Sequence, residues 1–241
     1  MKKTKTIRAD YTLVEMLVVI GIAAIVVGIM LPSLGKMMMG NKVNTAASQF
    51  SSAVIRAQAK AVANRQYVAV ILFTDRNSPG PRYSSYRLAV VNKSGSNYAF
   101  SEWLPNSHVE RLPEGTVVAE ADDKSGFKLN SGSNVTTPVF TNAQLNNAFP
   151  ALREITGTDS GKHYPAAEKG LIFGPYGNCE NGATTPIYII VAEGTADANG
   201  IVFTAFDKAA KRLGNYIQFE INPFTGRTKF TGGDEYANDN K

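Results

Sequence analysis

The side chains that could carry catalysis are few and do not form a recognisable catalytic set. The two histidines, His108 and His163, have no Cys, Asp or Glu partner at metal-ligand spacing, so we expect no zinc or iron site. The single cysteine, Cys179, cannot form an intrachain disulfide and is expected to be a small packed or loop residue. The adjacent acids Asp122 and Asp123 would face opposite ways in a strand, or water in a turn. The sequence also lacks a nucleophile elbow, a P-loop and an H-E-x-x-H motif, so we expect neither an enzyme nor a bound cofactor.

The residue with the most unusual chemical setting is a carboxylate inside an apolar run. Glu15 is the one charged residue between Tyr11 and Leu31, in the sequence YTLVEMLVVIGIAAIVVGIML. As a helix that rises about 1.5 Å per residue, this run is long enough to cross a hydrocarbon layer roughly 30 Å thick. A carboxylate in the bilayer costs about 2.5–3.5 kcal/mol, so we expect it to have a partner. The basic residues of the same chain lie back towards water, which favours a partner on another chain.

A cleaved secretory signal peptide and a plain membrane anchor are the alternative roles for this run. Glu15 lies within the apolar part and no A-x-A site closely follows Leu31, which disfavours the signal peptide. A plain anchor has no use for a costly carboxylate, which disfavours the second alternative.

The residues before the apolar run predict its orientation. Lys2, Lys3, Lys5 and Arg8, against Asp10, give the first ten residues a net charge of +3 out of the total of +5, which leaves +2 for the remainder. By the positive-inside rule, we expect the N-terminus in the cytoplasm and the rest of the chain exported. A net charge of +2 is a weak attraction for nucleic acid, so the basic composition mainly reflects membrane topology.

The run and its flanks resemble a known protein superfamily. The segment YTLVEMLVVIGIAAIVVGIMLP, which follows a short basic leader and ends at Pro32, is similar to the class III signal and hydrophobic helix of type IV pilins and type II secretion pseudopilins. The resemblance implies that a prepilin peptidase cuts between Asp10 and Tyr11 and methylates the new amine. It implies that Glu15 then pairs with the N-terminal amine of a neighbouring subunit. Other pilin or pseudopilin subunits and an inner-membrane assembly machinery are the implied partners.

One position departs from the pattern of that superfamily. Its members have glycine, or sometimes alanine, before the cut, whereas this chain has Asp10. A residue without a side chain suits a cleft that holds extended backbone, and Asp10 adds bulk and charge. An uncut chain would have no free amine at Tyr11 and would be a membrane-tethered domain that does not polymerise.

The helical pattern continues beyond the apolar run, and we expect one helix from about Thr12 to Asn64. Bends or local melting are expected at Gly28, Pro32 and Gly35. Beyond these positions, apolar side chains recur at spacings of three and four, which predicts a helix face packed on the domain's own sheet. The residues of this face are Val43, Ala46, Ala47, Phe50, Ala53, Val54, Ala57 and Ala61.

Beyond Asn64 the pattern changes to short β-branched and aromatic runs separated by turn residues, which predicts strands. The predicted strands are Tyr67–Phe73, Tyr86–Val91, Tyr98–Leu104, Thr116–Ala119, Lys124–Leu129, Val135–Phe140, Leu171–Phe173, Ile187–Ala192, Tyr216–Ile221 and Arg227–Phe230. The region from Asn142 to Lys169 contains no clear strand, and we interpret it as an insertion with a short helix near Ala143–Leu152. Trp103, in an alternating strand, is expected to belong to the core.

The expected fold class is α+β, with a long N-terminal transmembrane and amphipathic helix packed on an antiparallel β-sheet domain, as in pilins. The expected organisation is a basic leader (1–10), a transmembrane helix (11–32), an amphipathic helix that enters the domain (33–65), a β-rich globular domain (66–231) with the insertion at about 142–169, and a polar tail (232–241).

The second half of the chain resembles the GspH/FimT group of minor pseudopilins. The resemblance rests on the helix end AVIRAQAKAVANRQYVAVILF, on GLIFGPYGN, and on the closing hairpin YIQFEINPFTGRTKF. Residues in places similar to those of the group are Arg56, Ala57, Ala61, Gly174, Gly177 and Gly226.

We therefore expect a non-enzymatic structural subunit, a minor pseudopilin of a type II secretion or type IV pilus-like filament. It would lie in the bacterial inner membrane as a single-pass protein with a periplasmic C-terminal domain. The first alternative is a minor pilin that binds DNA during uptake. Its candidate phosphate contacts are Lys208, Lys211 and Arg212, which would share one helical face. Further basic candidates in the final hairpin are Arg227 and Lys229. The candidate residues for stacking on bases are Tyr216 and Phe230. The second alternative is the unprocessed, membrane-tethered periplasmic domain.

Overall fold

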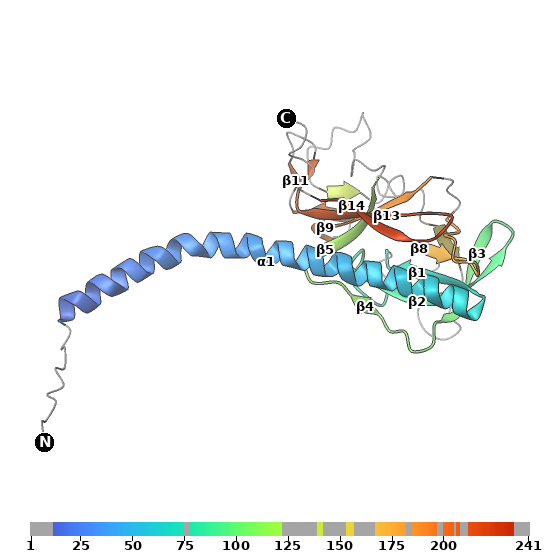
Figure 1. Ribbon diagram of the computed structural model, residues 1–241, viewed down its shortest axis with the longest axis horizontal. Coiled ribbons are helices and arrows are strands. Elements are labelled where there is room, and N and C mark those ends of the chain that lie inside the picture. The colour runs from blue at the N-terminus through green and yellow to red at the C-terminus, as the bar shows by residue number, and fades with distance from the viewer. Residues whose placement is uncertain are drawn as a thin grey trace, which may run out of the picture. The chain divides into compact units, whose positions relative to one another are not determined.

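The computed structural model describes residues 12–74, 78–121, 139–141, 153–156, 167–181, 185–196, 200–204, 206–207 and 212–233 (Figure 1). The chain forms two compact units, Met1–Gly40 and Asn41–Lys241. The first unit contains the beginning of the long helix, and the second contains the remainder of the helix and all the strands.

Helix α1 (Leu13–Asn64) is a single helix of 52 residues, as predicted. The eight residues of its predicted apolar face, from Val43 to Ala61, are all exposed by 2% or less. The helix ends in a Schellman motif, in which the Gln66 N–H bonds to the Ala61 carbonyl and the Arg65 N–H bonds to the Val62 carbonyl. Arg65 holds the left-handed φ of 51° that this ending requires, and this sharp stop turns the chain directly into the first strand.

The first sheet closes on itself. Strand β1 pairs with both β2 and β8, β8 pairs with β7, β7 pairs with β3, and β3 pairs with β2. These five strands therefore form a small barrel, and β4 extends it by pairing with β2. All its pairings are antiparallel except that of β3 with β7. The bounds are β1 Tyr67–Leu72, β2 Ser85–Ser94, β3 Asn97–Trp103, β4 Glu110–Arg111, β7 Arg153–Thr156 and β8 Ala167–Phe173.

The second sheet is built around β9. Its order is β14-β13-β9-β10-β6, and β5 also pairs with β9. The bounds are β5 Thr116–Ala121, β6 Val139–Thr141, β9 Ile187–Ala196, β10 Gly200–Phe203, β13 Tyr216–Ile221 and β14 Thr228–Gly233. A separate two-stranded pair is formed by β11 (Phe206–Asp207) and β12 (Arg212–Leu213).

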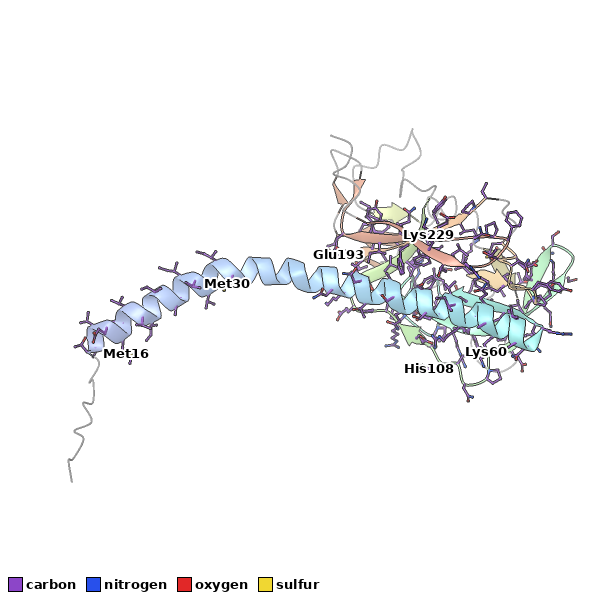
Figure 2. The ribbon with its side chains drawn as sticks, viewed as in Figure 1. Met16, Met30, Lys60, His108, Glu193 and Lys229 are labelled. Carbon is purple, nitrogen blue, oxygen red and sulfur yellow. The ribbon has the colours of Figure 1, made fainter. Side chains whose placement is uncertain are left out.

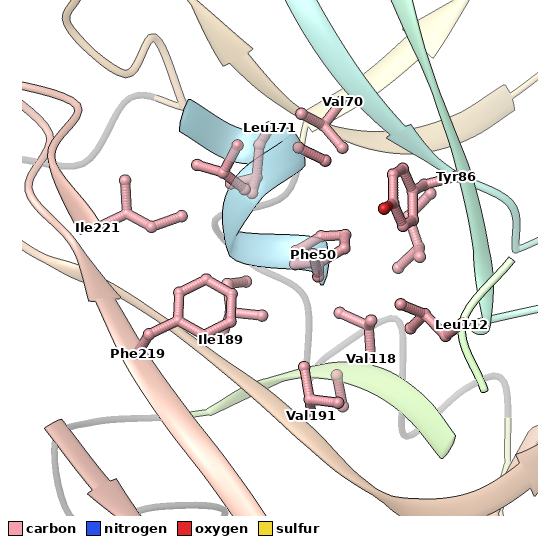
Figure 3. Packing of buried hydrophobic residues seen from close by; sticks show 14 of the residues in the cluster. Phe50, Val70, Tyr86, Leu112, Val118, Leu171, Ile189, Val191, Phe219 and Ile221 are labelled. Atoms are coloured by element: carbon pink, nitrogen blue, oxygen red, sulfur yellow. The ribbon is translucent and has the colours of Figure 1, made fainter. Parts of the chain in front are cut away.

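Two hydrophobic cores lie on the two faces of the barrel wall. The even-numbered residues of β1, from Val68 to Leu72, join a main core that also contains α1 and the second sheet. Ala69 and Ile71 instead face a barrel core. This is why β1 is an almost continuous apolar run and not an alternating one. In the main core, the Phe50 ring of α1 lies 5.3 Å from Tyr86 of β2 and 6.0 Å from Phe219 of β13, between the two sheets (Figure 3).

The expected α+β class and the main strands are confirmed, with three corrections. The expectation that 142–169 contains no clear strand is wrong, because β7 lies within it and β8 begins there, and both are held by backbone pairing in the barrel wall. The β domain is not purely antiparallel, because β3 and β7 run parallel. The short strands β4, β10, β11 and β12 were not predicted. The predicted strand Lys124–Leu129 and the helix near Ala143–Leu152 lie outside the described residues, and of Val135–Phe140 only the end is described, in β6.

Candidate assembly and interaction surfaces

Glu15 lies in the first turn of α1 and caps the helix. Its Oε2 accepts hydrogen bonds from the Thr12 N–H at 2.9 Å and from the Thr12 Oγ1 at 3.0 Å. The Glu15 N–H in turn donates to the Thr12 Oγ1 at 3.2 Å. This reciprocal arrangement is a capping box, which satisfies N–H groups that have no partner within the helix. The capping role was not predicted, although the T-L-V-E sequence before an apolar run carries its signature.

The apolar segment of α1 that contains Glu15 is exposed in the single chain. Residues Leu13–Met30 form a segment of 18 residues with a mean hydropathy of 2.8, none of which is buried. By length and composition this segment can cross a membrane, as a signal sequence also can. Figure 2 shows its side chains, from Met16 to Met30, extending outward around the helix. So large an exposed apolar surface requires lipid or other helices as its surroundings.

The structure describes the predicted bending sites in α1 but not the predicted processing site. Asp10 and Tyr11 lie outside the described residues. The backbone is helical at Gly28, Pro32 and Gly35, so local melting is not seen there, and a bend at these positions stays a prediction. A side chain added at Gly28 would meet nothing within 4 Å.

Arg56 ties the second half of α1 to the edge strand β4. Its Nη2 donates to both carboxylate oxygens of Glu110, at 2.6 and 2.8 Å. The Tyr86 hydroxyl donates to the same carboxylate at 2.9 Å. Burial of the phenol, together with the Glu110 charge, raises the pKa of Tyr86 well above its ordinary value, so this hydroxyl remains a donor. The sequence resemblance singled out Arg56, and the structure gives it this structural role.

Gln58, two residues further on, ties α1 to two loops of the β domain. Its Nε2 donates to the Gly177 carbonyl at 3.1 Å and to the Thr225 carbonyl at 2.5 Å. Gly177 and Gly226 both have positive φ angles, of 84° and 63°. A Cβ on Gly226 would lie 2.2 Å from the Gly177 carbonyl oxygen, so the two loops approach as closely as glycine allows. The sequence resemblance singled out both glycines but did not indicate that Gln58 joins their loops.

A second polar cluster surrounds Glu180, beside the barrel. Its carboxylate accepts hydrogen bonds from Lys93 at 2.6 Å, Tyr98 at 2.7 Å and Asn178 at 2.7 Å. Burial alone would raise the pKa of Glu180, but the three donors outweigh it and hold the pKa below its ordinary value. Burial and the Glu180 charge raise the pKa of Tyr98 to about 12. These three hydrogen bonds hold Glu180 in place and give it a structural role.

The residues considered for nucleic-acid contact do not form the expected helical face. Lys208 and Lys211 lie outside the described residues, and Arg212 lies in the strand β12, opposite Asp207 of β11. The expectation that Arg212 shares a helical face is therefore wrong, because its backbone is extended. Tyr216 packs against the main core. Of the hairpin residues, Arg227, Lys229 and Phe230 are exposed.

Residues considered for metal or thiol chemistry have ordinary surroundings where they are described. Cys179 is buried, as expected, and its Sγ lies 3.4 Å from the Asn181 Oδ1. His108 is exposed on the loop before β4. Trp103 packs against the barrel core, as expected, with the Arg87 guanidinium 4.3 Å from its ring centre. Within the described part of the chain, no group of three or more His, Cys, Asp or Glu side chains could hold a metal ion.

An open pocket of about 840 Å³ lies at one end of the second unit. Pro81, Leu112 and Val117 give it apolar walls, and Arg111 and Glu114 are polar members of its lining. It also includes the end of β9 at residues 194–196. This pocket was not predicted from the sequence.

Two of the solved structures found to be similar to this chain are a minor pilin and a minor pseudopilin. No protein-family model and no curated protein matches the chain. The chain is similar to the type IV minor pilin FimU of Pseudomonas aeruginosa, with 12% identity and a TM-score of 0.41 over 80% of this chain and 90% of that one. It is similar to the minor pseudopilin EpsH of the type 2 secretion system of Vibrio cholerae, with 10% identity and a TM-score of 0.35 over 78% of this chain and 95% of that one. Their names are those of the superfamily that the N-terminal motif resembles, and at these TM-scores the likeness carries no conclusion about function.

Proposed function

We propose that this protein is a non-enzymatic structural subunit of a short pilus-like filament, of the minor pseudopilin kind. The observation that carries the proposal is the wholly exposed apolar segment Leu13–Met30, which has one carboxylate in its first turn. Such a segment can be held by lipid before assembly and by the helices of other subunits afterwards. Residues 1–10 would be a leader in the cytoplasm, residues 11–32 would cross the bacterial inner membrane, and the second unit would be periplasmic.

In this proposal Glu15 has two consecutive partners. In the single chain it caps its own helix, and both of the Thr12 donors reach the same oxygen, Oε2. Within the described part of the chain, Oε1 accepts no hydrogen bond, so it remains available to the N-terminal amine of a neighbouring subunit. A charge-assisted bond of that kind is roughly twice as strong as a neutral one. The cap would orient the carboxylate, and the neighbour's amine would fix the stagger between helices.

The first experiment is to determine the N-terminus of the protein purified from its host membranes, by intact mass and N-terminal peptide mapping. A start at Tyr11 with a methylated amine is expected. A start at Met1 would replace the filament subunit with a tethered domain, because Glu15 would then have no free amine to meet.

The second experiment distinguishes the two roles of Glu15, as a cap of its own helix and as the partner of a neighbour's N-terminal amine. Val19→Cys introduces a thiol at an exposed position of the apolar segment, where it can cross-link neighbouring helices. The natural Cys179 is buried and should not compete in this reaction. We expect an oxidant to give a ladder of cross-linked species, and Glu15→Gln to reduce its yield at least several-fold. Glutamine preserves the capping-box geometry but removes the charge. Thr12→Val is the matched control, since it removes the cap and keeps the charge, and it should leave most of the ladder. Equal ladders from Glu15→Gln and the natural sequence would reject the amine pairing.

A further inference from the structure

The exposed large apolar side chains of the second unit are concentrated in a few places. Within its described residues they are Ile55, Val62, Tyr176, Phe224 and Phe230. Tyr176 and Phe224 are 94% and 70% exposed, and they lie on the two loops that Gln58 joins. Two large aromatic side chains held out into solvent on adjoining loops are typical of a binding surface.

The two loops are ordered before any partner arrives. The Cys179 N–H bonds to the Pro223 carbonyl at 2.8 Å, which joins one loop to the other. The Asn222 Oδ1 accepts the N–H groups of Phe224 and Thr225, each at 3.0 Å, and so closes the turn. Aromatic side chains on a preformed backbone lose little conformational entropy on binding. We call Tyr176, Phe224 and the adjacent Arg227 the aromatic end.

The open pocket described above lies at the opposite end of the second sheet. Phe224 follows Ile221, which pairs with Ile187 at the start of β9. The pocket includes Gly194, near the end of the same strand. Gly194 lies seven residue steps along the strand from Ile187, which is about 23 Å at about 3.3 Å per residue. The aromatic end and the pocket are therefore on opposite ends of one compact unit.

The chemistry of the pocket matches that of the aromatic end. Pro81 is the exposed apolar residue that a ring can contact, whereas Leu112 and Val117 also line the pocket but are 6% and 1% exposed. Arg111 is exposed in the pocket lining and can stack on an aromatic face. Glu114, also exposed there, has the opposite charge to Arg227 of the aromatic end. In the part of the chain that the structure describes, Arg111, Glu114 and Arg227 belong to no ion pair.

We propose that the aromatic end of one copy of this chain docks into the pocket of the next copy, with Arg227 facing Glu114. Because the two surfaces differ and lie at opposite ends of the unit, the contact is heterologous and repeats from copy to copy along one direction. A contact of this kind suits a filament, so the inference rests on the proposed function and specifies how the domains meet.

The test uses the full chain in its host membranes, with a photoreactive benzoylphenylalanine in place of Tyr176. We expect a light-dependent species of two copies, with the cross-linked peptide mapped to segment 80–84 or 111–117. The matched control places the same group at Phe230, which is also an exposed aromatic residue but lies outside the aromatic end. Position 230 should give less than a tenth of the adduct on those segments. Absence of the adduct at position 176, or attachment to another protein, to nucleic acid or to another surface of this chain, overturns the proposal.

Charge reversal gives an independent check on the pairing of Arg227 with Glu114. Arg227→Glu and Glu114→Arg should each lower the yield of the position-176 adduct several-fold, and the two together should restore most of it. Failure of the double reversal to restore the adduct would exclude this register. The Val19→Cys ladder is measured in the same cells. A normal ladder without the position-176 adduct refutes only this contact, whereas an absent ladder and an uncut N-terminus refute the filament itself.

Discussion

At the scale of single residues, Glu180 is held by a dense set of polar contacts, since Lys93, Tyr98 and Asn178 all donate to its carboxylate. Its side chain is only 15% exposed, so these bonds are partly shielded from water. The lowered pKa means that the folded state favours the charged form. The stabilisation is therefore fully present above the ordinary value of 4.5 and is lost as the pH falls through the lower native pKa.

Glu180→Gln should lower the free energy of unfolding at pH 7 by about 1–2 kcal/mol, because a charged acceptor of three donors becomes neutral. The difference from the natural sequence should shrink as the pH falls below about 4.5. Urea unfolding of the full chain in detergent, between pH 7 and pH 3, measures both. Glu102→Gln, at an exposed position on β3, is the control and should change stability by less than about 0.5 kcal/mol. A difference that grows towards low pH would contradict the assignment.

The surroundings of a single residue can be predicted from the sequence where they depend on a local pattern. Buried Cys179 and the packed ring of Trp103 follow from composition and alternation. The cap at Thr12 and Glu15 was open to prediction, because both partners lie within four residues of each other. The bonds from Gln58 to Gly177 and Thr225 were not, because they span 119 and 167 residues of sequence and depend on the completed fold.

Among the elements, the sequence predicts those whose apolar pattern is long. Helix α1 and strands β1, β9 and β13 each contain a long apolar run, either continuous or periodic, that indicates the element. Strand β7 has four residues, of which Ile155 is the buried apolar one, and it is extended because β8 and β3 pair with its two edges. No local pattern could indicate that pairing, since it forms only when the barrel closes.

The contact between Gly170 of β8 and Ile155 of β7 gives a direct test of barrel closure. A Cβ on Gly170 would lie 2.7 Å from the Ile155 Cδ1 and 3.1 Å from the Val70 carbonyl oxygen. Gly170→Ala should therefore destabilise by about 1–3 kcal/mol through overpacking. Ile155→Val removes the Cδ1, so in that background the cost of Gly170→Ala should fall by about 1 kcal/mol.

Ile172→Val is the matched control for this cycle. It deletes the same group from another residue of the barrel core, but Ile172 is not among the nearest neighbours of the added Cβ. The cost of Gly170→Ala, measured by urea unfolding, should be unchanged in that background. Equal costs in all three backgrounds would show that β7 does not lie against β8 as described.

For the whole molecule, the division into two units follows from where apolar surface is buried. The first unit exposes every residue of Leu13–Met30, whereas the second buries apolar side chains from Val43 onward, and its main core, which begins at Ala46, includes both sheets. The sequence indicates this division, because a run that is apolar on all sides gives way to one with a single apolar face. It does not indicate the closed barrel or the pocket, which depend on pairings between distant strands.

A chain that begins at Asn41 should therefore fold without the first unit. The truncation removes no residue of the main core, and asparagine is among the best N-cap residues for the new helix start. We expect its urea midpoint to lie within the error of that of the full chain, since both expose the same core on unfolding. We also expect it to remain in the aqueous phase of a detergent partition, where the full chain enters the detergent phase. Val43→Asp in the truncated chain is the control that should unfold it, because that side chain is 1% exposed. A truncated chain that fails to fold would mean that the turns of α1 before Asn41 stabilise the β domain, and the two units would then be one.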